Sequence, residues 1–470
     1  MCSRIAILKR HPILPTFLKW VQIILLILPL KNGSYLWLVQ ITLAGSTMDT
    51  QSTNYKIMYE RNVKWIEEIV TQQNEWRHNT INLIASENVM SERARRVMGS
   101  DFAHRYAEGH PGERYYQGTD KIDEIESWVK QQLRTLFNCQ HIEVRPISGT
   151  VANDAVFSRY IIPGDVVMVN STPGGGHISH HKSGSVGKYT KNIVDFPLAP
   201  DGYHIDVEQT QHLIKKLHPK VLILGKSLFL FPEPITDLVE ICRDNEATII
   251  YDAAHVLGLI AGKQFQDPLT EGADIVTAST HKTFFGSQRG LIMSNVDTKE
   301  WWKIDKGAFP GSSSNHHLDT LVSLAITICE MLVFAEEYAQ QTITNAKALA
   351  RSLCERGFEV QAKAFDFTET HQIAVDVSEL GGGNEVARIL KENDIILNMN
   401  LLPFEPLEKV TNPSGIRLGV QEMTRFSMKE KEMENIAELF KKCLKDGVSV
   451  KNEVRALRKA FQKVHYSFDR

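Results

Sequence analysis

The sequence predicts an α/β protein with a mostly parallel sheet in a large domain and a smaller α/β domain after it. Three observations support this. Short apolar runs alternate with helix-like segments through the middle of the chain, the rhythm of a parallel sheet covered on both faces. The 470 residues exceed one compact core. The composition, 43% hydrophobic and 23% charged, is that of an ordinary globular protein. The candidate strands are residues 142–146, 166–169, 192–196, 221–224, 248–251, 275–277 and 291–294.

The first 47 residues differ in composition from the rest. Three basic residues precede two apolar runs of about ten residues each, namely Arg4, Lys9 and Arg10, then residues 20–30 and 35–44. A helix that spans a bilayer needs roughly 20 residues, so neither run is expected to cross one. The segment fits a secretory signal that ends near Ala44-Gly45, or a translated leader before a true start at Met48. We prefer the leader, because the chain becomes polar and helical from Met48 onward.

Charge and cysteine content narrow the class of protein. A net charge of −3 gives no reason to expect nucleic acid or an anionic membrane as partner. The six cysteines are scattered and form no C-x-x-C pair, which favours reduced thiols in a cytoplasmic enzyme over a disulfide framework or a zinc site. We therefore expect a cytoplasmic protein without a bound metal.

Two segments precede the predicted sheet. Residues 59–73 carry apolar side chains at helical spacing and predict a helix. Residues 82–88 resemble an extended segment that runs into a helix, with Ser86 as candidate N-cap. A loop follows at residues 105–118, because its three glycines and one proline disfavour regular structure. Its tyrosines, arginines and glutamates suggest a functional loop.

Two further patterns lie at predicted strand ends. Residues 148–153 place a glycine between hydroxyl side chains where a helix should begin, and backbone N–H groups at a helix start bind anions. Three glycines then precede His177, with His180 and His181 close behind. No carboxylate or cysteine stands at a matching spacing, so a metal site is not expected.

The strongest chemical signal comes from two neighbouring strands. The run at 248–251 is followed by Asp252, and the run at 275–277 leads through Ser279 and His281 to Lys282. A pyridoxal phosphate enzyme needs this pair, since a lysine binds the cofactor's aldehyde and an aspartate keeps its ring nitrogen protonated.

The C-terminal part carries one conspicuous basic residue. Arg417 stands in a short apolar strand between glycines, and a half-buried guanidinium needs an anion such as a carboxylate. Residues 318–353 predict a long helix into the smaller domain. Residues 450–464 predict a basic amphipathic helix, interpreted as surface packing.

Taken together, the motifs from about Asn82 to Gln421 resemble the glycine/serine hydroxymethyltransferase family. The resemblance implies the aspartate-aminotransferase fold (fold type I) and pyridoxal phosphate as cofactor. It also implies reversible interconversion of serine and glycine, with tetrahydrofolate or tetrahydromethanopterin taking the one-carbon unit. Gln117 and residues 315–317 look closer to archaeal members, which keeps the second carrier open. Family members form homodimers with shared active sites.

The resemblance also implies roles for individual residues. Lys282 would bind the cofactor, Asp252 would face its ring nitrogen and His177 would stack on its ring. The expected cofactor site consists of Ser148, Gly149, Thr150, His177, Ser227, Asp252, His255, Ser279, His281, Lys282 and Gly290. The substrate would be held by Ser86, Arg417, Glu108 and Tyr116. Glu108 would move protons during one-carbon transfer, with Tyr106 and Tyr116 given across the dimer interface.

Three residues depart from the family pattern. His110 replaces a tyrosine, Ser287 a proline, and Arg289 a glycine of the loop that approaches the neighbouring subunit's phosphate. Either the Arg289 guanidinium takes over a phosphate contact, or this loop has shifted.

The predicted organisation is a leader (1–47), an N-terminal arm (48–80), a large cofactor domain (81–325) and a small domain (326–470). Two alternative functions share these residues. One is an aldolase that cleaves threonine-like amino acids without a carrier, and the other is a non-catalytic homologue.

Overall fold

The computed structural model describes residues 22–29, 35–42 and 48–469, with side chains from residue 55 onward. It divides into two units, residues 1–75 and residues 76–470. The basic residues Arg4, Lys9 and Arg10 and the Ala44-Gly45 pair, which entered the leader prediction, lie outside the described residues.

The first unit contains a hairpin and most of a helix. Strand β1 (Gln22–Pro29) pairs antiparallel with β2 (Tyr35–Thr42) along its whole length. Helix α1 (Met48–His78) includes the helix predicted at 59–73, so this prediction is confirmed. Its apolar residues Val63, Ile66 and Val70 are each more than half exposed.

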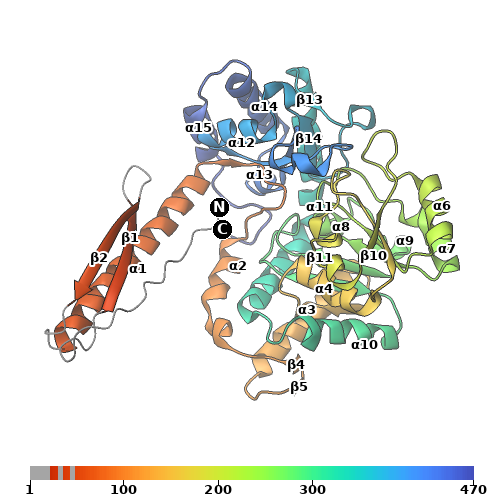
Figure 1. Ribbon diagram of the computed structural model, residues 1–470, viewed down its shortest axis with the longest axis horizontal. Coiled ribbons are helices and arrows are strands. Elements are labelled where there is room, and N and C mark those ends of the chain that lie inside the picture. Colours follow the sequence, from red (N-terminus) through yellow and green to blue (C-terminus); the bar gives the residue numbers. More distant parts are fainter. Residues whose placement is uncertain (1–21, 30–34, 43–47, 470) are drawn as a thin grey trace, which may run out of the picture. The chain divides into compact units, whose positions relative to one another are not determined.

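A seven-stranded sheet forms the centre of the second unit (Figure 1). Its order is β6-β12-β11-β10-β9-β7-β8. Strand β12 runs in the direction opposite to that of the other six strands, which all run the same way. All seven predicted strands are present, and the mostly parallel α/β fold is confirmed. The strands are β6 (His141–Glu143), β7 (Val166–Val169), β8 (Asn192–Asp195), β9 (Val221–Leu224), β10 (Thr248–Asp252), β11 (Ile275–Ser279) and β12 (Gly290–Ser294).

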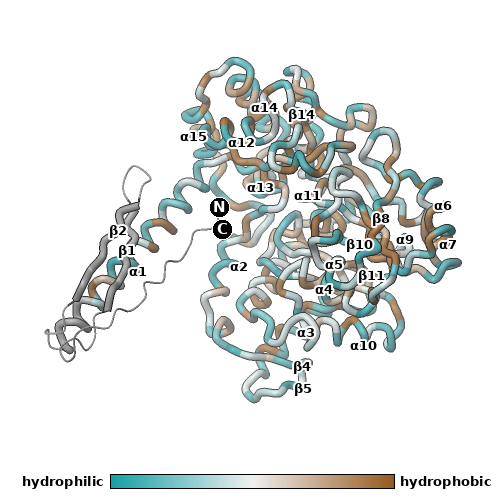
Figure 2. The backbone as a smooth tube through the Cα atoms, viewed as in Figure 1, coloured by the Kyte–Doolittle hydropathy of each residue, from teal (hydrophilic) through white to brown (hydrophobic). Residues whose placement is uncertain are grey.

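Alternate strand residues enter two different apolar clusters. Leu222 and Tyr251 pack with helices on one face of the sheet, whereas Val221 and Ile250 pack with helices on the other. A strand points successive side chains to opposite faces, so a continuous apolar run is the mark of a strand covered on both sides. Figure 2 shows hydrophobic stretches of the backbone near the strands labelled β10 and β11. The accompanying helices are α3 (Asp120–Phe137), α4 (Gly149–Tyr160), α5 (Val186–Tyr189), α6 (Val207–Leu217), α7 (Ile235–Asp244), α8 (Leu257–Ala261), α9 (Pro268–Glu271) and α10 (Thr298–Lys306).

The long helix α11 (Leu318–Glu355) connects the sheet to the C-terminal part and confirms the helix predicted at 318–353. Leu321 and Ile328 pack in the cluster over the sheet, and Leu349 and Leu353 pack in the C-terminal cluster. Among the described residues α11 is the one helix long and apolar enough to cross a membrane, and 61% of its most apolar stretch is buried within the protein. Its apolar side chains therefore serve as core.

The C-terminal part has its own four-stranded sheet, in the order β13-β14-β17-β16. These strands are β13 (Glu359–Val360), β14 (Gln372–Asp376), β16 (Asn398–Asn400) and β17 (Gly415–Gly419). The helices are α12 (Gly383–Glu392), α13 (Gln421–Arg425), α14 (Glu430–Leu444) and α15 (Lys451–Lys459). Strand β3 (Ile81–Asn82) pairs with β15 (Ile395–Ile396), so this early segment packs with the C-terminal cluster. The domain boundaries at residues 80 and 325 stay predictions.

Three local predictions need correction. Helix α2 (Glu92–Arg96) begins after Ser91, whose side chain accepts from Ala94 N at 3.2 Å, so Ser91 and not Ser86 is the N-cap. The loop at 105–118 contains a short hairpin of β4 (Gly109–His110) and β5 (Glu113–Arg114), because the intervening Pro111-Gly112 makes a tight turn. Helix α15 ends at Lys459, short of the predicted residue 464.

Candidate active site

Lys282 and Asp252 lie in one cavity. Strand β10 ends at Asp252 and its parallel neighbour β11 ends at Ser279, with Asp252 opposite Thr277 in register. The carboxyl ends of parallel strands open at the same edge of a sheet, where such folds place their ligands. The cavity there is lined by Gly149, Thr150, Asn153, His177, His180, Lys226, Asp252, Ala254, His255, Ser279 and Lys282. The lining includes seven of the eleven residues expected around the cofactor.

Asp252 is held as a buried anion. Its Oδ2 accepts from Asn153 Nδ2 at 2.8 Å and from His180 Nε2 at 3.1 Å, and its Oδ1 accepts from Ala254 N at 2.9 Å. Burial alone would raise the pKa of this carboxyl, but the hydrogen bonds from His180 and Asn153 hold it well below its usual range. Asn153 is oriented in turn by Thr277, whose hydroxyl donates to Asn153 Oδ1 at 2.5 Å. An ionised carboxylate is what a protonated pyridine nitrogen requires as partner.

Lys282 is half-buried, and its amine has an altered pKa. Its Nζ lies 3.5 Å from Ser279 Oγ, and Asn88 Nδ2 fixes its backbone by donating to its carbonyl at 2.7 Å. Burial lowers the pKa of Lys282 to about 8; the Asp252 carboxylate opposes this change and Arg417 adds to it. A larger fraction of this amine is therefore neutral at physiological pH than for an ordinary lysine, as a nucleophilic lysine requires.

The start of helix α4 could hold an anion. Ser148 caps the helix by accepting from Val151 N at 3.2 Å. A Cβ on Gly149 would lie 2.3 Å from Ser279 Oγ, and a Cβ on Gly290 would lie 2.2 Å from the Ser148 carbonyl oxygen. Only glycine at these two positions lets the helix start approach β11 and β12 so closely. The free N–H groups of the first turn are then directed to the same edge of the sheet as Lys282. Ser148 and Gly290 thus shape this edge without lining the cavity.

The three neighbouring histidines have three different partners. His177 lines the cavity, and its Nδ1 lies 2.7 Å from Ser179 Oγ. Burial lowers the pKa of His177 to about 4, so its ring is uncharged. His180 binds Asp252, and His181 Nε2 donates to the carbonyl of Asn170 at 3.0 Å. Within the described part of the chain, no three His, Cys, Asp or Glu side chains are arranged to hold a metal ion.

Arg417 is a buried cation without an acidic partner among the described residues. Its Nη1 donates to the carbonyl and hydroxyl of Ser227 at 2.6 and 3.0 Å, and its Nε and Nη2 donate to Asn398 Oδ1. Burial lowers the pKa of Arg417 to about 10. Ser227, expected near the cofactor, instead anchors this guanidinium. A desolvated arginine held only by neutral groups is ready to pair with a carboxylate.

The remaining predicted residues lie around or away from the cavity. Ser86 lies in the turn after β3, and its neighbour Ala85 touches Gly419 at the end of the strand that carries Arg417. Half-buried His281 follows β11 and does not line the cavity; burial lowers its pKa to about 4. Tyr106, Glu108 and Tyr116 also lie outside the cavity lining. The two tyrosines are 55% and 43% exposed, with Tyr116 Oη 3.1 Å from Glu108 Oε2.

Arg289 makes no contact at the anion site. Its guanidinium is fully buried and donates to the carbonyls of Val144 and His317, to Thr320 Oγ1 at 2.7 Å and to His316 Nδ1 at 2.9 Å. The first alternative, in which this guanidinium takes over a contact with the neighbouring subunit's phosphate, is therefore wrong, because its N–H groups are committed to the interior. The neighbouring Ser287 is also buried, and its hydroxyl donates to the Thr320 carbonyl at 2.8 Å.

Sequence reasoning missed several residues of the site. Asn153 lies at the end of the segment 148–153 and His180 lies in the histidine cluster, but a hydrogen bond to a carboxylate 99 or 72 positions away leaves no local signal. Lys226 also lines the cavity, but its Nζ donates to the Tyr203 carbonyl at 2.6 Å and lies 3.5 Å from Glu233 Oε1. Lys282 is consequently the lysine of this cavity that lacks a carboxylate partner among the described residues.

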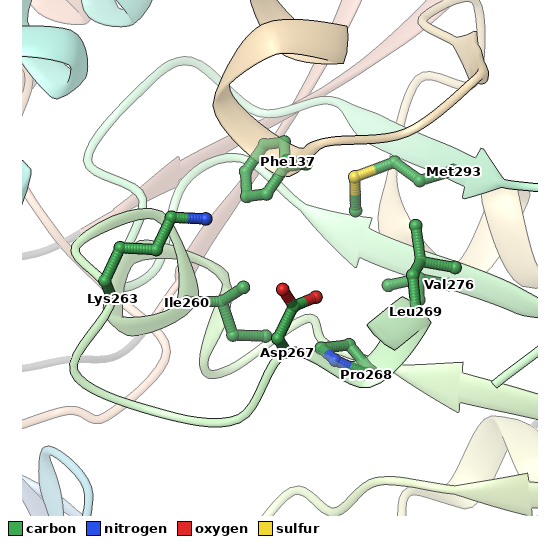
Figure 3. A pocket seen from close by; sticks show the side chains of 8 residues that line it. All are labelled: Phe137, Ile260, Lys263, Asp267, Pro268, Leu269, Val276 and Met293. Atoms are coloured by element: carbon green, nitrogen blue, oxygen red, sulfur yellow. The ribbon is translucent and has the colours of Figure 1, made fainter. Parts of the chain in front are cut away.

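A second cavity lies away from these residues (Figure 3). It is lined by Phe137, Ile260, Lys263, Asp267, Pro268, Leu269, Val276 and Met293. Its side chains are mostly apolar, and Lys263 Nζ donates to the carbonyl of Leu136 at 3.2 Å. None of the candidate cofactor or substrate residues lines this second cavity.

Known proteins resemble this chain over most of its length. Residues 60–440 match the family described as serine hydroxymethyltransferase. A serine hydroxymethyltransferase of Archaeoglobus fulgidus is 49% identical over 394 residues, covering 83% of this chain and 90% of that protein. One from Methanosphaera stadtmanae is 46% identical over 404 residues, covering 86% and 95%. Among solved structures, L-threonine transaldolase from Pseudomonas fluorescens superposes with a TM-score of 0.81 at 28% identity, covering 89% of this chain and 96% of that one.

Proposed function

Since the chain belongs to the serine hydroxymethyltransferase family, it interconverts serine and glycine, and we propose that it passes the one-carbon unit to a reduced pterin. The candidate carriers are tetrahydrofolate and tetrahydromethanopterin. Two serine hydroxymethyltransferases from archaea are 49% and 46% identical to this chain, which supports tetrahydromethanopterin as a candidate.

The residues of the cavity fit pyridoxal phosphate, the family's cofactor. The buried Asp252 carboxylate can pair with a protonated ring nitrogen. The backbone N–H groups at the start of α4 can bind a phosphate, and the Lys282 amine can react with an aldehyde. When bound, the cofactor supplies an aldehyde and a ring that accepts electrons from the substrate. Ser148, Gly149 and Thr150 would hold the phosphate, and His177 would lie against the ring.

The protein's own groups then have distinct tasks. Lys282 would hold the cofactor's aldehyde, and its lowered pKa makes a larger fraction of the amine neutral for this task than in an ordinary lysine. Asp252 keeps a proton on the ring nitrogen because its carboxylate stays ionised when buried. Ser279 accepts a hydrogen bond from Lys282 Nζ and so orients the amine. The observation that carries the proposal is this pairing of a lysine of lowered pKa with an ionised aspartate in one cavity.

We propose that Arg417 and Ser86 bind the carboxylate of serine or glycine. Arg417 supplies a desolvated planar fork, the geometry that grips a carboxylate with two parallel hydrogen bonds. Its strand β17 touches the turn that carries Ser86. One end of the substrate would thus be fixed between the C-terminal sheet and this turn.

Glu108 is the proposed acid and base for one-carbon transfer, and its backbone is firmly held. Arg114 Nη1 donates to the carbonyls of Ala107 and Gly109, both at 2.7 Å, on either side of Glu108. Arg114 itself is fixed by Asp123 at 2.8 Å and Glu126 at 2.6 Å. General acid–base catalysis needs a carboxyl at a defined position, and a backbone held on both sides of Glu108 supports this role.

The exposed loop is also the basis for a proposed homodimer. Tyr106, Glu108 and Tyr116 lie outside the Lys282 cavity of their own chain, so we propose that they complete the cavity of a second copy. The exposed apolar face of α1 would embrace that copy. We further propose a cytoplasmic location.

The threonine transaldolase similarity supports one alternative, a carrier-independent reaction on β-hydroxy amino acids. A glycine–serine exchange assay, run separately with tetrahydrofolate, with tetrahydromethanopterin and without carrier, tests the proposal. We expect turnover of serine to require one carrier. Equal turnover of serine without any carrier would favour the aldolase.

A further inference from the structure

Gln372 reaches the cofactor cavity indirectly, from the C-terminal sheet. It is the first residue of β14, its side chain is fully buried, and its Nε2 lies 2.9 Å from His255 Nδ1. His255 follows β10 and lines the cavity together with Asp252 and Lys282. The contact joins two residues 117 positions apart in the chain.

The orientation of the Gln372 amide is determined by the contact of its oxygen, while its nitrogen also lies 3.3 Å from His371 Nε2. Its Oε1 accepts from the backbone N–H of Phe229 at 3.1 Å. A backbone N–H only donates, so the oxygen must face Phe229 and the NH₂ group must face His255. Two further bonds fix this segment, since Thr370 Oγ1 donates to the Phe229 carbonyl at 2.5 Å and Glu369 N donates to the Leu230 carbonyl at 2.8 Å.

The amide in turn determines the proton position on His255. An amide NH₂ only donates, so Nδ1 of His255 must accept and cannot carry a hydrogen. Burial and the nearby cations Lys282 and Arg417 hold the pKa of His255 well below its usual value, and the ring is neutral. Its one hydrogen is then on Nε2, which has no hydrogen-bond partner within the described part of the chain.

We propose that Gln372 is a positioning residue of the cofactor site, which fixes His255 in the tautomer protonated on Nε2. His255 thereby presents a hydrogen-bond donor to an acceptor atom of the bound pyridoxal phosphate, and the wrong tautomer would present a lone pair instead. In metal sites, the partner of a histidine's other ring nitrogen likewise fixes the tautomer in which that histidine binds the metal. The C-terminal sheet is in this way part of the cofactor site, although Gln372 itself touches only protein groups. The inference rests on cofactor binding and is independent of the identity of the carrier.

The first test measures the tautomer in the native protein. In the full-length protein labelled with ¹⁵N in its histidine rings, the His255 signals are identified by their loss in His255→Asn. We expect Nδ1 to be unprotonated and Nε2 to be protonated, both with and without pyridoxal phosphate. A hydrogen on Nδ1 would overturn the proposal without any variant of Gln372.

The second test replaces the donor group of Gln372 that faces His255 by an acceptor and keeps the shape of the side chain. In Gln372→Glu one carboxylate oxygen still accepts from Phe229, but the group that faces His255 becomes an acceptor. We expect Nδ1 of His255 to become protonated. At a pH where the spectrum shows a neutral ring, the dissociation constant of pyridoxal phosphate should rise about tenfold, the cost of one ordinary hydrogen bond.

A matched control is Gln340→Glu, at an exposed position of α11, which should change neither the ring nor the cofactor affinity. If Gln372→Glu weakens cofactor binding while His255 stays protonated on Nε2, the role of Gln372 is packing alone and the proposal is wrong.

Discussion

Replacement of Arg417 by methionine tests how the substrate carboxylate is bound. The guanidinium is buried and has only neutral partners, Ser227 and Asn398, within the described residues. A carboxylate that enters this site therefore meets a positive charge that no protein anion has neutralised. The substitution removes that charge and leaves the incoming carboxylate desolvated without a counterion.

The size of the effect follows from the energy of a buried charge pair. Loss of one partner of such a pair costs about 2–5 kcal/mol, and each 1.4 kcal/mol or so corresponds to tenfold in affinity. The dissociation constant of glycine should thus rise by a factor between about 30 and several thousand. Arg417→Lys keeps the charge but loses the planar fork, so its effect should fall near the lower end of that range.

Spectral titration of the holoenzyme with glycine and with ethanolamine separates the possible causes. Ethanolamine is serine without its carboxylate, so its binding should change little in Arg417→Met. Arg388→Met is a suitable control, because Arg388 is an exposed arginine of the same sheet region that pairs with Glu385 and Glu392 on α12. Unchanged glycine binding, or equal losses for glycine and ethanolamine, would refute the carboxylate role.

Three further outcomes are expected. Attachment of pyridoxal phosphate to the apoprotein needs the neutral form of Lys282, so its rate constant should rise about tenfold per pH unit and level off near pH 8; a rise that continues to pH 10 would contradict the effect of burial. Glu108→Gln should slow carrier-dependent transfer by about 100-fold or more but leave cleavage of β-phenylserine nearly unchanged, and Arg114→Lys should show the same selectivity more weakly; equal losses in both reactions would argue against a proton role. Arg289→Leu should lower the free energy of unfolding by about 3 kcal/mol in urea titrations, since it leaves buried carbonyls without a donor; a loss below about 1 kcal/mol would show that the carbonyls find other partners.

The sheet was predictable because its signal is local. Strands β7, β8, β9, β10, β11 and β12 each contain an apolar run of two or more residues, whereas β6 has a weaker signal. The limits of β7 and β9 match the predicted ones to the residue. The positions of Lys282 and Asp252 followed from the same pattern, because adjacent parallel strands end at one edge. In contrast, the run at 82–88 gave a wrong helix start, since Ser91 offers the same capping chemistry five residues later.

The contacts around these two residues had no local signal. Asn153 and His180 contact Asp252 from segments that are distant from it in the chain. Gln372 contacts His255 from the C-terminal sheet. Arg289 is the opposite case. Its place in the motif suggested contact with an anion, but in the folded protein its guanidinium donates to groups of the interior. Residue type and spacing thus identified the groups that we propose for the chemistry, whereas the groups that orient them depend on the folded arrangement.

Reduction of the holoenzyme with borohydride, followed by peptide mass mapping, tests the central assignment most directly. The cavity holds two lysines, and Lys226 is already bound to Tyr203 and close to Glu233. We predict that the pyridoxyl group is found on Lys282 alone, and that Lys282→Ala but not Lys226→Met loses the visible absorbance of the bound cofactor. A label on Lys226, or an unchanged visible spectrum in Lys282→Ala, would contradict the account.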